Sequence, residues 1–104
     1  MTNLIVQFAV YGALKDGNEN ESQAYDVRQT LQAVFNAAPS GSDGIVKIDN
    51  NTMGGDPSPG NKKHFAAIVT HDGVTANFAC EEGQTIDFHH SLAPNPPNKA
   101  EEPA

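Results

Sequence analysis

The sequence predicts a mainly β protein, a compact β-sandwich-like domain of about five or six strands with one short helix. Several short segments alternate apolar and polar residues with a period of two, while one segment has helical spacing. Clusters of Gly, Pro, Asn and Asp separate these segments and mark turns. The 104 residues suit one domain. We expect this domain to span residues 1–92, followed by a flexible, Pro-rich acidic tail over 93–104.

A first strand is expected over residues 4–11, ending at Gly12. Strict alternation divides its side chains between two faces, Leu4, Val6, Phe8 and Val10 on one and Ile5, Gln7, Ala9 and Tyr11 on the other. Residues 15–22 are polar throughout, so we expect an exposed loop there.

The spacing changes after this loop and predicts a helix from about Val27 to Ala37. Apolar residues recur at intervals of three and four, at Val27, Leu31, Val34 and Phe35. Asp26 is available as an N-cap, and Pro39 lies beyond the expected end.

Four further strands are expected after the helix. A short strand covers residues 45–48, and a hairpin over 64–80 turns at Asp72-Gly73. A two-residue turn unites the more apolar faces and pairs Phe65 with Cys80, whereas a three-residue turn would place His64 opposite Cys80. We favour the shorter turn for that reason. After a turn at 81–83, a last strand contains Ile86 and Phe88.

The loop from Asp49 to Gly60 is expected to hold one conformation. Its two consecutive glycines permit positive φ, its two prolines restrict φ, and an Asp side chain can bond nearby amides. A loop of fixed shape can present a surface at little entropic cost. The residues expected to contact a ligand are Asn50, Asn51, Gly54, Gly55, Asp56 and Ser58.

Composition excludes some partners. The net charge of −7 repels phosphate backbones and anionic lipid surfaces, so we expect neither nucleic acid nor membrane as a partner. A single cysteine excludes an internal disulfide, and the first residues lack the features of a signal peptide. These observations favour a cytoplasmic location.

No group of residues forms a clear catalytic or metal-binding pattern, and no cofactor is expected. His89 and His90 would point to opposite faces of a strand and could not readily share a metal. Cys80 would need His64 beside it to act as a nucleophile. Asp49 and its neighbours offer oxygen ligands for calcium, but their spacing differs from an EF-hand loop and local turn bonds explain them better.

The order of several short motifs resembles a known family. These motifs are Tyr11-Gly12, Asp26-Val27, Asn50-Asn51, Gly54-Gly55-Asp56-Pro57 with Pro59-Gly60, and Lys62-Lys63. Over residues 4–88, the chain is similar to the small domain of unknown function at the C-terminus of the DnaJ homologue subfamily C, member eleven, also found as standalone or appended copies in bacterial and fungal proteins. The resemblance implies a small β-rich sandwich-like scaffold and no catalytic residue.

The sequence therefore favours a noncatalytic recognition module that binds a protein or carbohydrate partner through exposed loops. Two alternatives stay open. One is a metal-dependent or hydrolytic enzyme using His and Asp residues. The other is a structural homo-oligomer, such as a homodimer, that pairs through edge strands.

Overall fold

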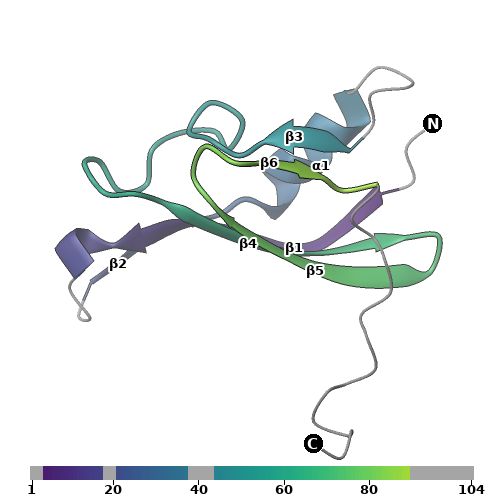
Figure 1. Ribbon diagram of the computed structural model, residues 1–104, viewed down its shortest axis with the longest axis horizontal. Helices are drawn as coiled ribbons and strands as arrows, with labels where there is room; N and C mark the ends of the chain where they lie inside the picture. The colour runs from purple at the N-terminus through teal and green to yellow at the C-terminus, as the bar shows by residue number, and fades with distance from the viewer. Residues whose placement is uncertain (1–3, 18–20, 38–43, 90–104) are drawn as a thin grey trace, which may run out of the picture.

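The computed structural model describes residues 4–17, 21–37 and 44–89 (Figure 1). These residues form two antiparallel sheets, one with strand order β2-β1-β4-β5 and one with order β3-β6. The elements are β1 (Leu4–Leu14), the 3-10 turn η1 (Lys15–Gly17), β2 (Ser22–Asp26), α1 (Arg28–Ala37), β3 (Ile45–Lys47), β4 (His64–His71), β5 (Val74–Glu81) and β6 (Thr85–Asp87). The predicted fold class, mainly β with about five or six strands and one short helix, is confirmed.

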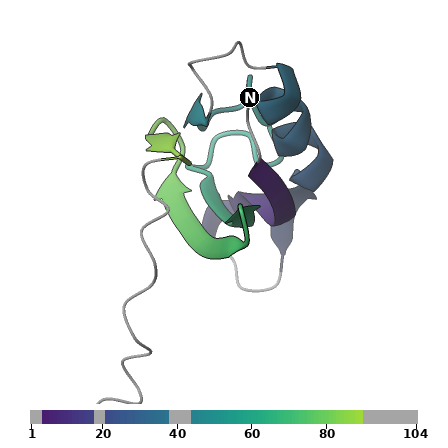
Figure 2. The same ribbon diagram turned by 90° about the vertical axis from the view of Figure 1, so that its right-hand side faces the viewer.

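Helix α1 and the β3–β6 pair lie side by side over the same face of the larger sheet (Figure 2). The core fills the space between these layers, and Phe88 lies at its centre. Its ring centroid is 5.1 Å from that of Phe35 on α1, 4.6 Å from that of Phe78 on β5 and 6.3 Å from that of Phe65 on β4. One aromatic side chain thus joins the helix to two strands of the sheet.

Strand β1 differs from its prediction in length and in the side chains it buries. It continues through Gly12 to Leu14, and its pairing with β4 shifts between Val6 and Phe8, where a β-bulge adds one residue. The bulge reverses the alternation, so that Val6 and Ala9 are both buried and Phe8 is 49% exposed. The predicted division of faces is therefore correct before the bulge and wrong after it.

Strand β2 begins at the last residue of the expected 15–22 loop and covers residues 23–26, for which the sequence predicted no element. It pairs with the second half of β1, with Gly12 opposite Ala24. The two backbones approach so closely there that a Cβ atom on Gly12 would lie 2.3 Å from the Ala24 Cα. Gly12 therefore allows β2 to pair where any side chain would collide with it.

The predicted helix is confirmed to within one residue. The Asp26 carboxylate accepts a hydrogen bond from the Arg28 N–H at 3.0 Å, as expected for a cap. Leu31 and Phe35 are buried against the sheet. Gln32 joins the helix to β1, because its side chain accepts a hydrogen bond from the Val6 N–H at 2.8 Å and donates one to a carbonyl oxygen of the same strand.

The predicted hairpin is confirmed in its register. Asp72 and Gly73 form a two-residue turn with φ of 51° and 83°, both values typical of the tight hairpin turn. His71 pairs with Val74, and Phe65 pairs with Cys80, as the shorter turn requires.

The expected tail at 93–104, and the domain limit at residue 92, lie outside the described residues. Within those residues, no helix combines the length and the apolar character needed to span a membrane.

We predict that Gly12→Ala lowers the free energy of unfolding by about 2–3 kcal/mol, because the added Cβ must push β1 and β2 apart. Gly17→Ala is the control: a Cβ there meets no atom within 4 Å and adds only the cost of a positive φ, about 1 kcal/mol. Urea unfolding of both variants measures the difference. Equal losses would contradict a steric role for Gly12.

Candidate functional site

The Asp49–Gly60 loop is joined to its neighbours by several side-chain contacts. Asp49 begins it with a tight turn in which its carboxylate accepts a hydrogen bond from the Thr52 N–H at 2.9 Å. Gly54 and Gly55 follow with φ of 89° and 150°, in the region that favours glycine. A Cβ on Gly55 would lie 3.4 Å from the Tyr25 ring, so the loop rests on β2.

Tyr11 attaches this loop to the larger sheet. Its hydroxyl donates a hydrogen bond of 2.6 Å to the Asn50 side-chain oxygen. Burial raises the pKa of Tyr11 to about 12, and the nearby carboxylates of Glu82, Asp49 and Asp56 raise it in the same direction. The hydroxyl therefore remains a protonated donor at neutral pH, and Asn50 is held from inside the protein.

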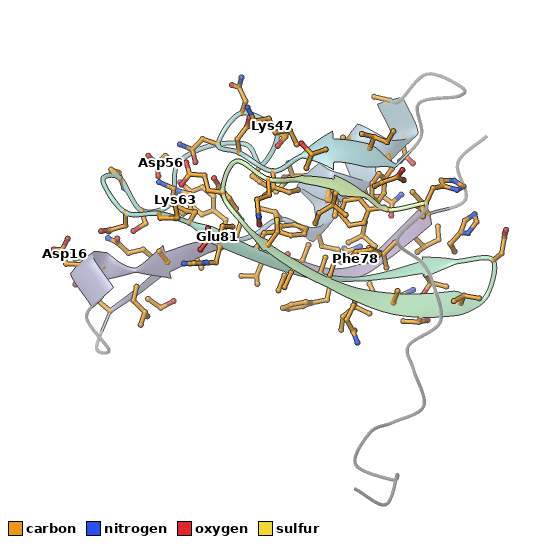
Figure 3. The ribbon with its side chains drawn as sticks, viewed as in Figure 1. Asp16, Lys47, Asp56, Lys63, Phe78 and Glu81 are labelled. Atoms are coloured by element: carbon orange, nitrogen blue, oxygen red, sulfur yellow. The ribbon has the colours of Figure 1, made fainter. Side chains whose placement is uncertain are left out.

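Lys63 holds the second half of the loop. Its side chain is only 4% exposed, and its ammonium lies 2.9 Å from the Asp56 carboxylate and 3.6 Å from that of Glu82 (Figure 3). It also donates a hydrogen bond to the Ser58 carbonyl oxygen at 3.1 Å. The hydrogen bond from Lys63 holds the pKa of the Asp56 carboxyl below its ordinary value. Lys63 thus joins the loop, β4 and the turn after β5.

Ser58 does not have the exposed position expected of a ligand contact. The residue is fully buried, and its hydroxyl donates to the Gln23 side chain at 2.7 Å and accepts from the Asn61 side chain at 2.8 Å. Its N–H also donates to the Asp56 carboxylate. Since every one of these partners is internal, Ser58 supports the loop and is not available to a ligand.

The other predicted ligand contacts divide into two groups. Asn50 and Asp56 are partly buried and are bonded to Tyr11 and Lys63, as described above. Gly55 is partly buried beside β2, whereas Asn51 and Gly54 are exposed. Asp49 and Asp56, whose oxygens the sequence offers as calcium ligands, accept backbone hydrogen bonds within the loop itself. The loop is therefore mainly a scaffold.

The candidate catalytic residues are also separated from one another. His64 lies opposite Glu81 in the hairpin, so it does not face Cys80 as a base would need to. Cys80 packs against the core, and burial raises the pKa of its thiol. The His71 and His89 rings contact each other with centroids 4.4 Å apart, and His90 lies outside the described residues. Within the ranges that the structure describes, no three His, Cys, Asp or Glu side chains are grouped as metal ligands.

A different surface combines apolar side chains from all four strands of the larger sheet. It is the face turned away from α1 and the β3–β6 pair, and side chains project from it into solvent in Figure 3. Phe8 and Ile5 are each 49% exposed, Leu14 is 44% exposed and Ile68 is 36% exposed. We call this surface the uncovered face; its apolar residues are Ile5, Phe8, Val10, Leu14, Ala24, Ala66, Ile68 and Ala79.

Two adjoining hollows lie on the uncovered face. One, of about 320 Å³, lies over the region where β2, β1 and β4 meet, at Gly12, Ala24 and Ala66. The second, of about 380 Å³, crosses from β1 to β5, beside Phe8, Ala66 and Ala79. Small residues form the floor and larger apolar residues stand beside it. An outward face of an antiparallel sheet is ordinarily polar, so this apolar surface departs from the usual pattern.

We predict that Lys63→Met lowers the free energy of unfolding by about 3 kcal/mol at neutral pH, because it leaves two partly buried carboxylates without their cation. Lys62→Met is the matched control. The Lys62 side chain is 60% exposed and lies 3.8 Å from Glu81, so its loss should change stability by no more than about 0.5 kcal/mol. Similar denaturant midpoints for the two variants would contradict the anchoring role.

The lowered pKa of Asp56 gives this anchor a pH dependence. In the unfolded chain the carboxyl titrates near its ordinary pKa of 3.8, and in the folded protein it titrates lower. Its contribution to stability is therefore complete above pH 3.8 and is lost as the pH falls through the folded-state pKa. We predict that the stability gap between the wild type and Asp56→Asn closes in this acid range. Urea unfolding from pH 7 to below pH 3.8 measures it, and a gap that does not narrow as the pH falls below 3.8 would refute the role of ionised Asp56.

Comparison of the chain with protein-family models, curated proteins and solved structures finds no match. The resemblance to the domain at the C-terminus of the DnaJ homologue subfamily C, member eleven, accordingly stays an expectation from the sequence. Residues of the chain itself therefore carry the functional argument, and the uncovered face is the surface whose composition departs most from that of an ordinary solvated sheet.

Proposed function

We propose that this domain is a noncatalytic interaction module that holds a segment of a partner protein on its uncovered face. The observation that carries the proposal is the exposure of Phe8, Ile68, Ile5 and Leu14 on one face of a single sheet. Exposed apolar side chains cost free energy in water, and burying them against a partner recovers about 25 cal/mol for each Å² removed from water. Contiguous surfaces of this kind mark binding sites.

The chemistry of the face favours a protein over a carbohydrate. Both hollows are lined mainly by aliphatic and aromatic groups. The polar side chains at its far end bond one another, since the Thr70 and Thr75 hydroxyls are 2.9 Å apart and Gln7 donates to Thr70. A sugar placed here would lose hydrogen bonds with water and gain few in return.

The charge of the uncovered face and of the chain indicates which kind of protein segment would bind there. The positions that share this face include the carboxylates of Asp26 and Glu81 near its ends, and Lys62 lies 3.8 Å from Glu81 at one of those ends. The whole chain carries a net charge of −7. A partner with a row of apolar side chains and basic residues at its flanks would be attracted at long range and correctly oriented on contact. A second copy of the chain would instead be repelled.

The Asp49–Gly60 loop has a supporting part in this proposal. By holding β2 through Gln23 and Tyr25, it keeps in place the strand that supplies Ala24 to the first hollow. The sequence favours recognition through exposed loops, and we propose recognition on a sheet face in its place. Asn51 and Gly54, the exposed part of the loop, stay as an additional contact that the sequence favours.

We predict that a synthetic amphipathic peptide with a row of leucines and lysine flanks binds the domain, and that its glutamate-flanked counterpart binds at least tenfold more weakly. Amide NMR shifts should change around Phe8, Ala66 and Ile68. The double variant Phe8→Ser with Ile68→Ser should weaken binding at least tenfold, because both are central apolar contacts.

Ile45→Ser is the control for this experiment, since Ile45 is 56% exposed but lies on β3, away from the uncovered face. It should leave the affinity unchanged. An equal loss with Ile45→Ser, or NMR shifts confined to residues 49–60, would overturn the assignment of the surface. A glycan that binds this face, or a stable dimer that buries it, would overturn the assignment of the partner.

A further inference from the structure

The outer edge of β5 presents backbone groups that no described residue satisfies. In a two-residue hairpin the closing pair, His71 and Val74, exchanges both backbone hydrogen bonds, so even-numbered residues of β5 face β4. The Glu82 N–H continues this pattern by donating to the Lys63 carbonyl oxygen at 2.9 Å. Odd-numbered residues must therefore direct their N–H and C=O groups away from β4.

Glu81 confirms this direction. Its N–H donates to the Gln84 side chain at 2.8 Å, and its carbonyl oxygen accepts from the Gln84 N–H at 3.1 Å, both beyond the edge of the sheet. Thr75, Asn77 and Ala79 have the same orientation by the two-residue period of a strand. Three N–H groups and three carbonyl oxygens thus line an open edge.

This edge borders a cleft between the two sheets. After the turn at 81–83, β6 pairs with β3, in the layer over the sheet that ends at β5. The space between β5 and β6 is a cleft of about 350 Å³. Its lining residues are Asn77, Phe78, Ala79, Cys80, Gln84, Thr85, Ile86 and Asp87. Polar groups make up most of the exposed lining of this cleft, and Phe78 and Ile86 are its larger apolar side chains.

Proteins usually protect a long edge strand with a bulge, a proline or a lysine that blocks pairing. The eight residues of β5 have none of these, and β5 pairs with β4 without a break in register. β1, in the interior of the sheet, is the strand that carries the bulge. We propose that this edge is a second binding site, which takes an extended segment of a partner protein as a fifth strand of the larger sheet.

The partner segment is defined by the chemistry of the cleft. Its backbone would pair with Thr75, Asn77 and Ala79, as in other cases of strand addition to a sheet edge. Every second side chain would enter the cleft toward Phe78 and Ile86 and should be small and apolar. The chain as a whole carries a net charge of −7, and Glu81 at the end of β5 is half-exposed 3.8 Å from Lys62, so the side chains that point away from the cleft should be basic. Two copies of this acidic chain would repel each other at the same edge.

The test uses a ten-residue peptide that alternates valine and lysine. On its addition to the full chain, hydrogen exchange at the Thr75, Asn77 and Ala79 amides should slow at least tenfold. Asn77→Pro removes one outward N–H while leaving the β4 hydrogen bonds intact, and it should weaken binding at least tenfold. Asn77→Ala, which keeps the N–H and removes the side chain, should bind as the wild type does.

Peptide N-methylation supplies a second readout that does not depend on folding of a variant. Only every second amide of a bound peptide faces β5. Methylation of that set of amides should abolish binding, and methylation of the other set should preserve it. Equal effects of the two methylated sets would overturn strand addition. Hydrogen exchange of the chain without peptide should not depend on its concentration. If exchange at these β5 amides slowed as the concentration rose, two copies of the chain would be pairing, and the proposed partner would be wrong. Loss of protection in Phe8→Ser with Ile68→Ser would assign the peptide to the uncovered face instead.

Discussion

The buried ammonium of Lys63 is the interaction on which the rest of the loop structure depends. A lysine so thoroughly removed from water is stable only beside opposite charge, and Asp56 and Glu82 supply it from two different segments. The cation thereby fixes where the 49–60 loop lies on the sheet. Ser58 and Tyr11 then bind the loop to β2 and β1. One desolvated charge thus determines the positions of elements far apart in the chain.

The sequence predicted those parts of the fold whose signals are local. The hairpin at Asp72-Gly73 and the helix ending at Ala37 follow from turn chemistry and from periodicity over neighbouring residues, and both are confirmed. The bulge between Val6 and Phe8 was missed because both registers keep apolar residues on each face, and only contact with β4 and Gln32 decides between them. β2 was missed because its pairing depends on the space left by Gly12, which is a property of two strands together.

The candidate site was predicted less well, for a related reason. The positive φ values in the 49–60 loop follow from its glycines. The sequence could not show that Ser58 faces inward, since its partners Gln23 and Asn61 lie outside the loop. The sequence of β4 does contain a pattern that could have predicted the uncovered face. Ala66 and Ile68 are apolar at positions between the buried residues, whereas a sheet that is solvated on one face normally carries polar residues there.

The position of Phe88 has a mechanical consequence for the cleft beside β5. Phe88 immediately follows β6, and its ring is wedged among Phe35, Phe65 and Phe78, so the spacing between the two sheets is set by aromatic packing. Moving β6 toward β5 would compress these rings, and moving it away would open a void. The packing of the Phe88 ring therefore sets the distance between the two sheets at the cleft beside β5. A partner strand that paired with β5 would find the cleft already formed. Its binding would therefore require no free energy to separate the two sheets.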